Sequence, residues 1–418
     1  MTSLRFADVD SHDPDAVDAW ARVPAVAMLQ ELPDEAQRAA RRRSVAGHRL
    51  RAAFDGDEPV GTLRSFDTEL TLPGAGPVTV DAVSSVGVLP THRRRGVLRH
   101  LVAEDLRRAR ETGHALAALI AMEAPIYGRF GFGAATRSTT WTLDADRAVL
   151  RPDAPAGGTL RLLDPRAGAG AQREVHDRAR RARAGGLERD RRWWDERFAV
   201  PSPADRRTHL VVHSGEDGHP DGYALYELTE AWAGRVPRSS ARVLDLTAVT
   251  AAAYADLWRF VASVDLVRTV SAGDRPEDEL LPHLLADPRA AQQQPVDDFL
   301  WLRVLDVPGA LCARRYLGRD SLVLRVEDPD GLAGGTVRLS VEGPARTPDG
   351  WTCGQVETCA DEPDVVLGVA ELGALLLGGG RATALAAAGR LVCASPDRAW
   401  RLDALLATPE QPWCPTWF

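Results

Sequence analysis

A short apolar strand that runs into an arginine–glycine turn and then into an amphipathic helix constrains this chain most. The strand covers residues 86–88, the turn covers 89–96, and the helix begins at Val97. The first turn of a helix offers backbone N–H groups without intrahelical partners, and the helix dipole is positive there. Gly96 allows a ligand to approach the backbone closely, and Arg93–Arg95 add positive charge. This combination predicts a binding site for a pyrophosphate group.

Arginine runs alone are weak evidence for such a site. The runs at 41–43 and 178–183 are typical of solvated helix faces. Two further features favour a phosphate site at 89–96: the strand directly upstream, and the segment Tyr127-Gly128-Arg129-Phe130-Gly131-Phe132 about 30 residues downstream.

From Val86 to Gly133 the chain resembles the Eis-type (enhanced intracellular survival) N-acetyltransferases of the GNAT superfamily. The resemblance extends to segments 221–226, 281–285 and 300–303 and to the aromatic C-terminal end. It implies an α/β fold with mixed sheets, in which tandem GNAT-like domains precede a sterol-carrier-like α/β domain. It also implies a homohexamer, a trimer of dimers.

Length and composition set bounds on the chemistry. A chain of 418 residues corresponds to about three domains. The sequence contains no lysine and no asparagine, which excludes a P-loop lysine and a Schiff-base lysine. The formal net charge of −8 argues against a nucleic-acid partner.

No metal site or membrane segment is expected. Five cysteines lie in the last third of the chain, without a C-x-x-C pair or a histidine at ligand spacing. The apolar stretch 365–392 is interrupted by Glu371, Arg381 and the glycines at 378–380, so it is not a membrane span. The first residues have no apolar core typical of a signal peptide. We therefore expect a cytoplasmic protein.

The pattern of apolar runs and turns suggests three units. Residues 14–54 look helical, and a linker-like stretch at 153–158 places the end of the catalytic domain near residue 150. Residues 151–296 form a second unit, in which a strand at 243–250 enters a helix without an arginine–glycine turn. We expect a GNAT-like domain that has lost its phosphate site. Residues 297–418 alternate β-like runs with an Ala/Leu-rich helical region, and we expect the C-terminus to reach the active site.

Tyr127 is the candidate general acid. A thiolate leaving group, with a pKa near 8.5 for a simple thiol, benefits from a proton or hydrogen-bond donor. A tyrosine in a glycine-rich turn is more often a packing residue. The resemblance implies the catalytic role, because the matching GNAT tyrosine faces the sulfur of the cofactor.

Phe418 is the candidate base. The last eight residues, 411–418, carry three large aromatic side chains and two prolines, so we expect this end to be buried. In the Eis-type family a terminal phenylalanine carboxylate acts as base. A carboxyl group near pKa 3.5 is mismatched with an ammonium near 8.5 by about 7 kcal/mol, so burial or a bridging water would have to help. The carboxylate could equally anchor a cationic substrate while bulk water removes the proton.

The resemblance also implies the acetyl-CoA contacts. The pantetheine arm would lie along Val86, Gly87 and Val88, and the pyrophosphate would be held by Arg94, Arg95, Gly96, Val97, Leu98 and Arg99. Met122 and Glu123 would line the other side of the cofactor. The segment 119–122 reads Leu-Ile-Ala-Met where some relatives carry a histidine.

The leading hypothesis is an acetyl-CoA-dependent N-acetyltransferase. It would act by direct transfer on a primary amine of a small molecule or peptide: an aminoglycoside, a polyamine or a lysine side chain. The alternative is a non-catalytic regulatory protein that binds CoA or an apolar ligand. A Tyr127→Phe change distinguishes them, since it should abolish turnover only if the protein is an enzyme.

Overall fold

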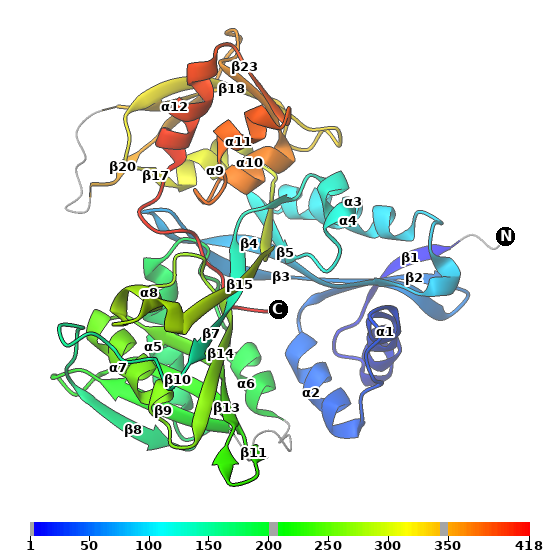
Figure 1. Cartoon of the computed structure of the whole chain (residues 1–418). Coiled ribbons are helices and arrows are strands. Elements are labelled where there is room, and N and C mark those ends of the chain that lie inside the picture. The colour runs from blue at the N-terminus through cyan, green and yellow to red at the C-terminus, as the bar shows by residue number, and fades with distance from the viewer. Residues whose placement is uncertain (1–3, 200–207, 343–349) are drawn as a thin grey trace.

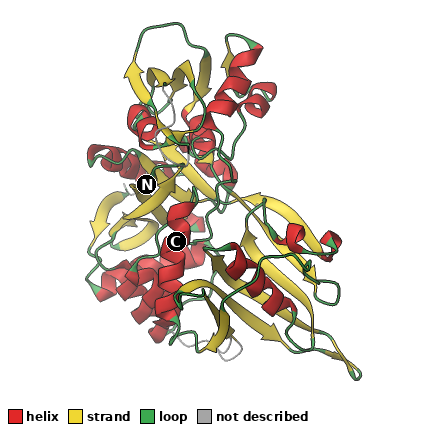
Figure 2. Cartoon of the chain, turned by 90° about the vertical axis from the view of Figure 1, so that its left-hand side faces the viewer, coloured by secondary structure: helices red, strands yellow, loops and turns green. Residues whose placement is uncertain are grey.

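The computed structural model describes residues 4–199, 208–342 and 350–418. Residues 1–3, which belong to the N-terminal stretch expected not to be a signal peptide, lie outside the described residues. Two seven-stranded sheets and one five-stranded sheet form the framework of this part of the chain. In Figure 1 the five-stranded sheet lies at the top, the N-terminal sheet in the middle and the second seven-stranded sheet below it. In Figure 2 the C-terminus lies near the middle of the molecule, away from the five-stranded sheet.

The first seven-stranded sheet has the order β1-β2-β3-β4-β5-β16-β6. Its strands are β1 (Arg5–Val9), β2 (Arg49–Asp55), β3 (Glu58–Leu72), β4 (Gly76–Val88), β5 (Leu116–Ile120), β16 (Leu300–Val304) and β6 (Gly133–Ala134). The expectation that residues 14–54 are helical is wrong in its last part, because 49–55 is strand β2. The residues of β2 alternate between two cores, which explains why they prefer a strand: Leu50 and Ala52 pack on one face and Ala53 on the other.

Helices cover both faces of this sheet. Helix α3 (Val97–Glu111) buries the apolar stripe expected from the sequence, including Leu101 and Leu106. Helices α1 (Pro14–Ala27) and α2 (Glu35–Val45) lie against the opposite face, where Trp20 and Val45 pack with Leu50. Each face of the first sheet is therefore covered by a hydrophobic core, and the opening lies where strands β4 and β5 part.

The parting of two parallel strands creates the main opening in the first sheet. Strands β4 and β5 pair only at Asp81 with Ala117 and at Ala82 with Ala118, and β4 then continues to Val88 without β5, paired with β3. A β-bulge adds one residue to β4 just beyond this point, and Ser85 there adopts a left-handed φ of 50°. Bulges bend a strand and redirect its side chains, so the residues near Ser85 face the opening.

The second seven-stranded sheet repeats this plan, with the order β15-β7-β14-β13-β10-β9-β8. Its strands are β15 (Ala291–Asp298), β7 (Arg137–Asp144), β14 (Val267–Arg275), β13 (Ser239–Ala248), β10 (Pro220–Thr229), β9 (Thr208–Ser214) and β8 (Thr159–Leu163). Helix α7 (Ala251–Ala262) connects β13 to β14, as α3 connects β4 to β5. The remaining helices of this unit are α5 (Ala169–Ala182), α6 (Arg191–Ala199) and α8 (Leu281–Leu284).

The sheets do not divide where the sequence suggested, at residues 150 and 296. Strand β7, inside the expected first domain, belongs to the second sheet, where it lies between β14 and β15. Strand β16, inside the expected third domain, completes the first sheet between β5 and β6. Each strand joins the sheet that offers it two antiparallel neighbours, so the two GNAT-like units are tied together by exchanged strands.

The five-stranded sheet has the order β21-β19-β18-β22-β23 and belongs to the C-terminal α/β unit. Its strands are β21 (Gln355–Thr358), β19 (Gly335–Val341), β18 (Asp320–Glu327), β22 (Val365–Gly368) and β23 (Leu391–Cys393); its helices are α9 (Val307–Ala313), α10 (Val369–Leu375), α11 (Ala382–Ala387) and α12 (Pro396–Leu406). A buried ion pair between Arg303 of β16 and Asp328 ties this unit to the first sheet, at 2.8 Å.

Candidate active site

A large cavity of about 940 Å³ opens where β4 and β5 part. It brings together four of the residues predicted from the sequence: Val86, Met122, Tyr127 and Phe418. Its walls come from α1, α2, β3, β4 and the start of α6, so segments far apart in the sequence meet in one site. We refer to it as the acceptor cavity.

Tyr127 lies at the end of the short helix α4 (Ala124–Tyr127), in which Pro125 occupies the first turn. Its ring packs edge-on against Phe132, with 6.2 Å between the centroids, and only 9% of the residue is exposed. Burial raises the pKa of the Tyr127 phenol to about 12, with a smaller contribution from the negative charge of Glu123. The phenol therefore stays protonated at neutral pH and can act as a donor in the cavity.

Phe418 reaches the cavity from the other end of the chain. The Ser84 hydroxyl donates a hydrogen bond to the oxygen of Phe418, at 2.8 Å. The Phe418 ring meets Phe66 of β3 edge-on, with 6.0 Å between centroids. Ser84 lies next to the β4 bulge, so the C-terminal residue contacts β4 at the point where this strand is bent.

The turn at 89–96 has the geometry of an anion site. Arg94 and Gly96 both adopt left-handed φ values, 61° and 79°, and no atom lies within 4 Å of the position of a Cβ on Gly96. No side chain caps the start of α3, so its first N–H groups face outward. Among the described residues, the guanidinium groups of Arg93–Arg95 and Arg99 have no carboxylate partner. The backbone and charges of this turn fit a pyrophosphate.

The other predicted cofactor residues lie along β4 and α3, outside the lining of the acceptor cavity. Val97 is buried in the core, so only its backbone amide is available to a ligand, as expected. Gly87 serves a packing role that the sequence did not reveal: a Cβ there would lie 3.1 Å from Cα of Pro24 in α1. Glu123 precedes α4, where its charge acts on Tyr127.

His48, Arg64 and Phe66 are among the lining residues that were not predicted from the sequence. The His48 ring stacks on Phe66, with centroids 4.5 Å apart. Burial lowers the pKa of His48 to about 3, and the nearby charges of Arg64, Arg192 and Arg49 act in the same direction. The imidazole is therefore neutral at working pH and a weak base. No local pattern identifies it, because His48 follows a glycine turn and reaches the cavity only through tertiary packing.

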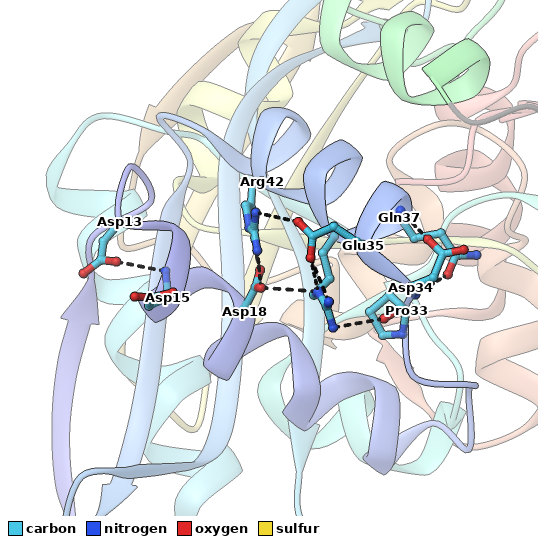
Figure 3. Close-up of polar contacts among 9 residues, drawn as sticks. Asp13, Asp15, Asp18, Pro33, Asp34, Glu35, Gln37 and Arg42 are labelled. Carbon is cyan, nitrogen blue, oxygen red and sulfur yellow. Dashed lines mark hydrogen bonds and ion pairs between the residues drawn. The ribbon is translucent and has the colours of Figure 1, made fainter.

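The α1–α2 wall of the acceptor cavity is held by a charge cluster. Figure 3 shows the side chain of Arg42 between Asp18 of α1 and Glu35 of α2. The hydrogen bond from Arg42 lowers the pKa of the Asp18 carboxyl, although burial opposes the shift. A capping box formed by Asp34 and Gln37 fixes the start of α2. The ion pair between Arg42 and Asp18 therefore joins α2 to α1, and the capping box stabilises the first turn of α2.

Across 4–199, 208–342 and 350–418, no group of three or more histidine, cysteine or acidic residues could hold a metal ion. In the same residues no helix is both long and apolar enough to cross a membrane.

Family models match most of the chain. Residues 8–135 and 185–304 each match an acetyltransferase (GNAT) domain, and residues 307–415 match a sterol carrier protein domain. The expected class of fold, mixed α/β with two GNAT domains followed by a sterol-carrier-like domain, is thereby confirmed.

Full-length relatives agree with these matches. An uncharacterised N-acetyltransferase of Streptomyces avermitilis is 42% identical over 409 residues, covering 96% of each chain. The N-acetyltransferase Eis of Mycobacterium tuberculosis is 39% identical over 367 residues, covering 85% of each chain. The crystal structure of Eis1 from Mycobacterium abscessus superimposes with a TM-score of 0.83, at 33% identity and full coverage of both chains. The chain belongs to the Eis family of GNAT enzymes and is an acetyl-CoA-dependent N-acetyltransferase.

Proposed function

We propose that the enzyme transfers an acetyl group directly to a primary amine, with Tyr127 as general acid and the α-carboxylate of Phe418 as base. One observation carries the proposal: Tyr127 and the C-terminal residue Phe418, which are far apart in the sequence, line one cavity beside the β4–β5 opening. Acetyl-CoA supplies an activated acyl group on a thiolate leaving group. The amine nitrogen would form a bond to the acetyl carbonyl carbon while the C–S bond breaks. The protonated Tyr127 phenol would donate to the departing sulfur, and the Phe418 carboxylate would take a proton from the amine or orient its ammonium form.

The base step needs help from the site. A free carboxyl group is too acidic to take a proton from an ordinary ammonium, by about 7 kcal/mol. In this structure the Ser84 hydroxyl donates to an oxygen of this carboxylate, and the Phe418 ring packs against Phe66. The alternatives left by the sequence, a bridging water or an anchoring carboxylate with proton loss to bulk water, remain compatible with this geometry.

The proposed acetyl-CoA contacts are those that the similarity to the Eis-type enzymes implies. Val86, Gly87 and Val88 follow the point where β4 leaves β5, so their edge of the strand is open to a pantetheine arm. The turn residues Arg94, Arg95 and Gly96, with the amides of Val97, Leu98 and Arg99, would hold the pyrophosphate. Met122, which lines the cavity, and Glu123 would face the other side of the cofactor.

The acceptor is proposed to be an aminoglycoside, a polyamine or a lysine-type amine. A cavity near 940 Å³ is large enough for any of these. The 1–150, 151–296 and 297–418 boundaries are proposed as functional units only, because strands are exchanged across them. A cytoplasmic homohexamer is proposed on the family resemblance alone.

The test is an assay of CoA thiol release from acetyl-CoA against a panel of primary amines, with a tertiary amine as control. The proposal expects saturable release and an N-acetylated product of the matching mass. Release without an acetylated amine would show hydrolysis and would contradict the proposed transfer.

A further inference from the structure

The second GNAT domain contains the same parting of parallel strands as the catalytic domain. Strands β13 and β14 pair from Ser239 with Val267 to Val243 with Ala272, and both strands continue beyond this point. In the catalytic domain the equivalent parting of β4 and β5 opens onto the acceptor cavity. The two partings occupy the same place in the topology, since a helix connects the two strands in both domains.

In the second domain the chain's own C-terminal end lies in this parting. Only a small space of about 130 Å³ is left there, bordered by Leu246 of β13, Asp274 of β14 and the side chains of Trp413 and Trp417. The Trp413 indole N–H donates to the carbonyl oxygen of Asp274, at 2.7 Å. The Trp417 indole N–H donates to the carboxylate of the same residue, at 2.9 Å.

Asp274 can hold both indoles because of its backbone conformation. Its φ of 52° lies in the left-handed region, where its strand pairing with β7 is irregular. Aspartate tolerates this region better than most residues. With this conformation, one residue directs both its carbonyl and its carboxylate toward the tail.

Arginines hold the rest of the tail. Arg189, itself paired with Asp245, donates to the hydroxyl of Thr416 at 3.1 Å and to the carbonyl of Pro415 at 3.0 Å. The guanidinium of Arg275 lies 5.0 Å from the centre of the Trp413 ring, a cation–π distance. These contacts are largely withdrawn from solvent, where such interactions are strongest.

The last contact with the second domain is made by Trp417, one residue before the Phe418 carboxylate. The Trp193 indole N–H donates to the carbonyl of Trp417, at 2.8 Å. The chain then passes into the catalytic domain, where Phe418 meets Ser84 and Phe66. The second domain therefore holds residues 413–417, and Phe418 enters the first domain, where it lines the acceptor cavity together with Trp417.

We propose that the second GNAT domain is a binding site for the chain's own residues 413–417, and that Asp274 is a positioning residue for the Phe418 carboxylate. This inference rests on the proposed function, in which that carboxylate acts in the acceptor cavity. The domain has kept the strand parting of an acetyl-CoA site and uses it to hold a peptide.

Three variants of the full-length chain test the inference. Asp274→Gly removes the carboxylate while allowing the left-handed φ, and Asp274→Asn keeps an oxygen that can accept from Trp417. Trp417→Phe removes the indole N–H. Trp232→Phe is the matched control, because Trp232 is similarly exposed, 50% against 48%, and also donates to a carboxylate, that of Glu230.

The expected result is a loss of kcat of about tenfold or more in Asp274→Gly and Trp417→Phe, because a displacement near 1 Å can cost up to a hundredfold. KM for acetyl-CoA should stay unchanged, and Asp274→Asn should restore most of the rate. Trp232→Phe should match the parent. Equal losses in the control, or losses that follow thermal stability alone, would overturn the inference.

A chain extended by one glycine after Phe418 separates this inference from the proposed function. Loss of turnover in the extended chain, with full activity in Asp274→Gly and Trp417→Phe, would overturn the positioning role alone. Full activity in all of them would overturn both the role of the terminus as base and the inference that depends on it.

Discussion

Replacing Tyr127 with phenylalanine removes the one donor assigned to the leaving sulfur while preserving the ring. The phenylalanine can keep the edge-on contact with Phe132, so the fold should be unaffected. The matched control is Tyr226→Phe in the second GNAT domain, where burial also raises the pKa of the phenol but the side chain does not line the acceptor cavity.

The size of the effect follows from the pKa of the phenol. At about 12, the Tyr127 phenol is more than three units less acidic than a simple thiol, so complete proton transfer to the thiolate would cost about 5 kcal/mol. The phenol should therefore act mainly as a hydrogen-bond donor to developing negative charge, which is worth about 1.5–3 kcal/mol. We expect kcat to fall by about tenfold to somewhat more than a hundredfold.

Steady-state kinetics measured by thiol release test this directly. KM for acetyl-CoA should change little in Tyr127→Phe, and the parent should show no alkaline decline from this residue below about pH 10, since its pKa lies near 12. A kcat within twofold of the parent would refute the assignment of Tyr127 as the donor.

Three stability predictions concern the scaffold of the site. Gly87→Ala should destabilise the fold by about 1–3 kcal/mol in urea unfolding, because the new methyl group would press on Pro24 at 3.1 Å; an unchanged midpoint would contradict this packing. Burial raises the pKa of Asp105 to about 8, so the native state holds a proton that the unfolded state loses near pH 4, and stability should fall as pH rises from 4 to 8. Asp105→Asn should therefore gain in melting temperature over the parent with rising pH, and a constant difference would refute the shift. Asp328→Asn should cost about 3–5 kcal/mol by leaving Arg303 buried without its carboxylate; a loss below 1 kcal/mol would contradict it.

The site motifs were predictable because they are local. The strand, turn and helix at 86–111 follow from adjacent residues, and the aromatic composition of 411–418 indicated burial of the C-terminal end. The structure places Phe418 against Ser84, a contact between residues 334 positions apart in the sequence.

The exchanged strands could not be assigned from sequence. Residues 300–304 form a short apolar run that suits any buried strand position, so nothing local specifies the first sheet. Their place depends on the free edges of β5 and β6, which only the tertiary structure provides.

The lining residues that were not predicted, such as His48, also depend on tertiary structure. His48 directly precedes β2, and its lowered pKa depends on burial and on the charges of its neighbour Arg49 and of the distant Arg64 and Arg192. Such an environment leaves no trace in residue spacing, whereas Gly96 and the arginines before it form a local pattern that the sequence shows directly.

The most direct test of the account adds one glycine after Phe418 and compares acetyl-CoA turnover with that of the unmodified chain. The extension moves the terminal carboxylate by about 3.5 Å and leaves every side chain in place. The account predicts loss of kcat on every amine that is a substrate, with acetyl-CoA binding intact. Unchanged turnover would contradict the role of the Phe418 carboxylate as base.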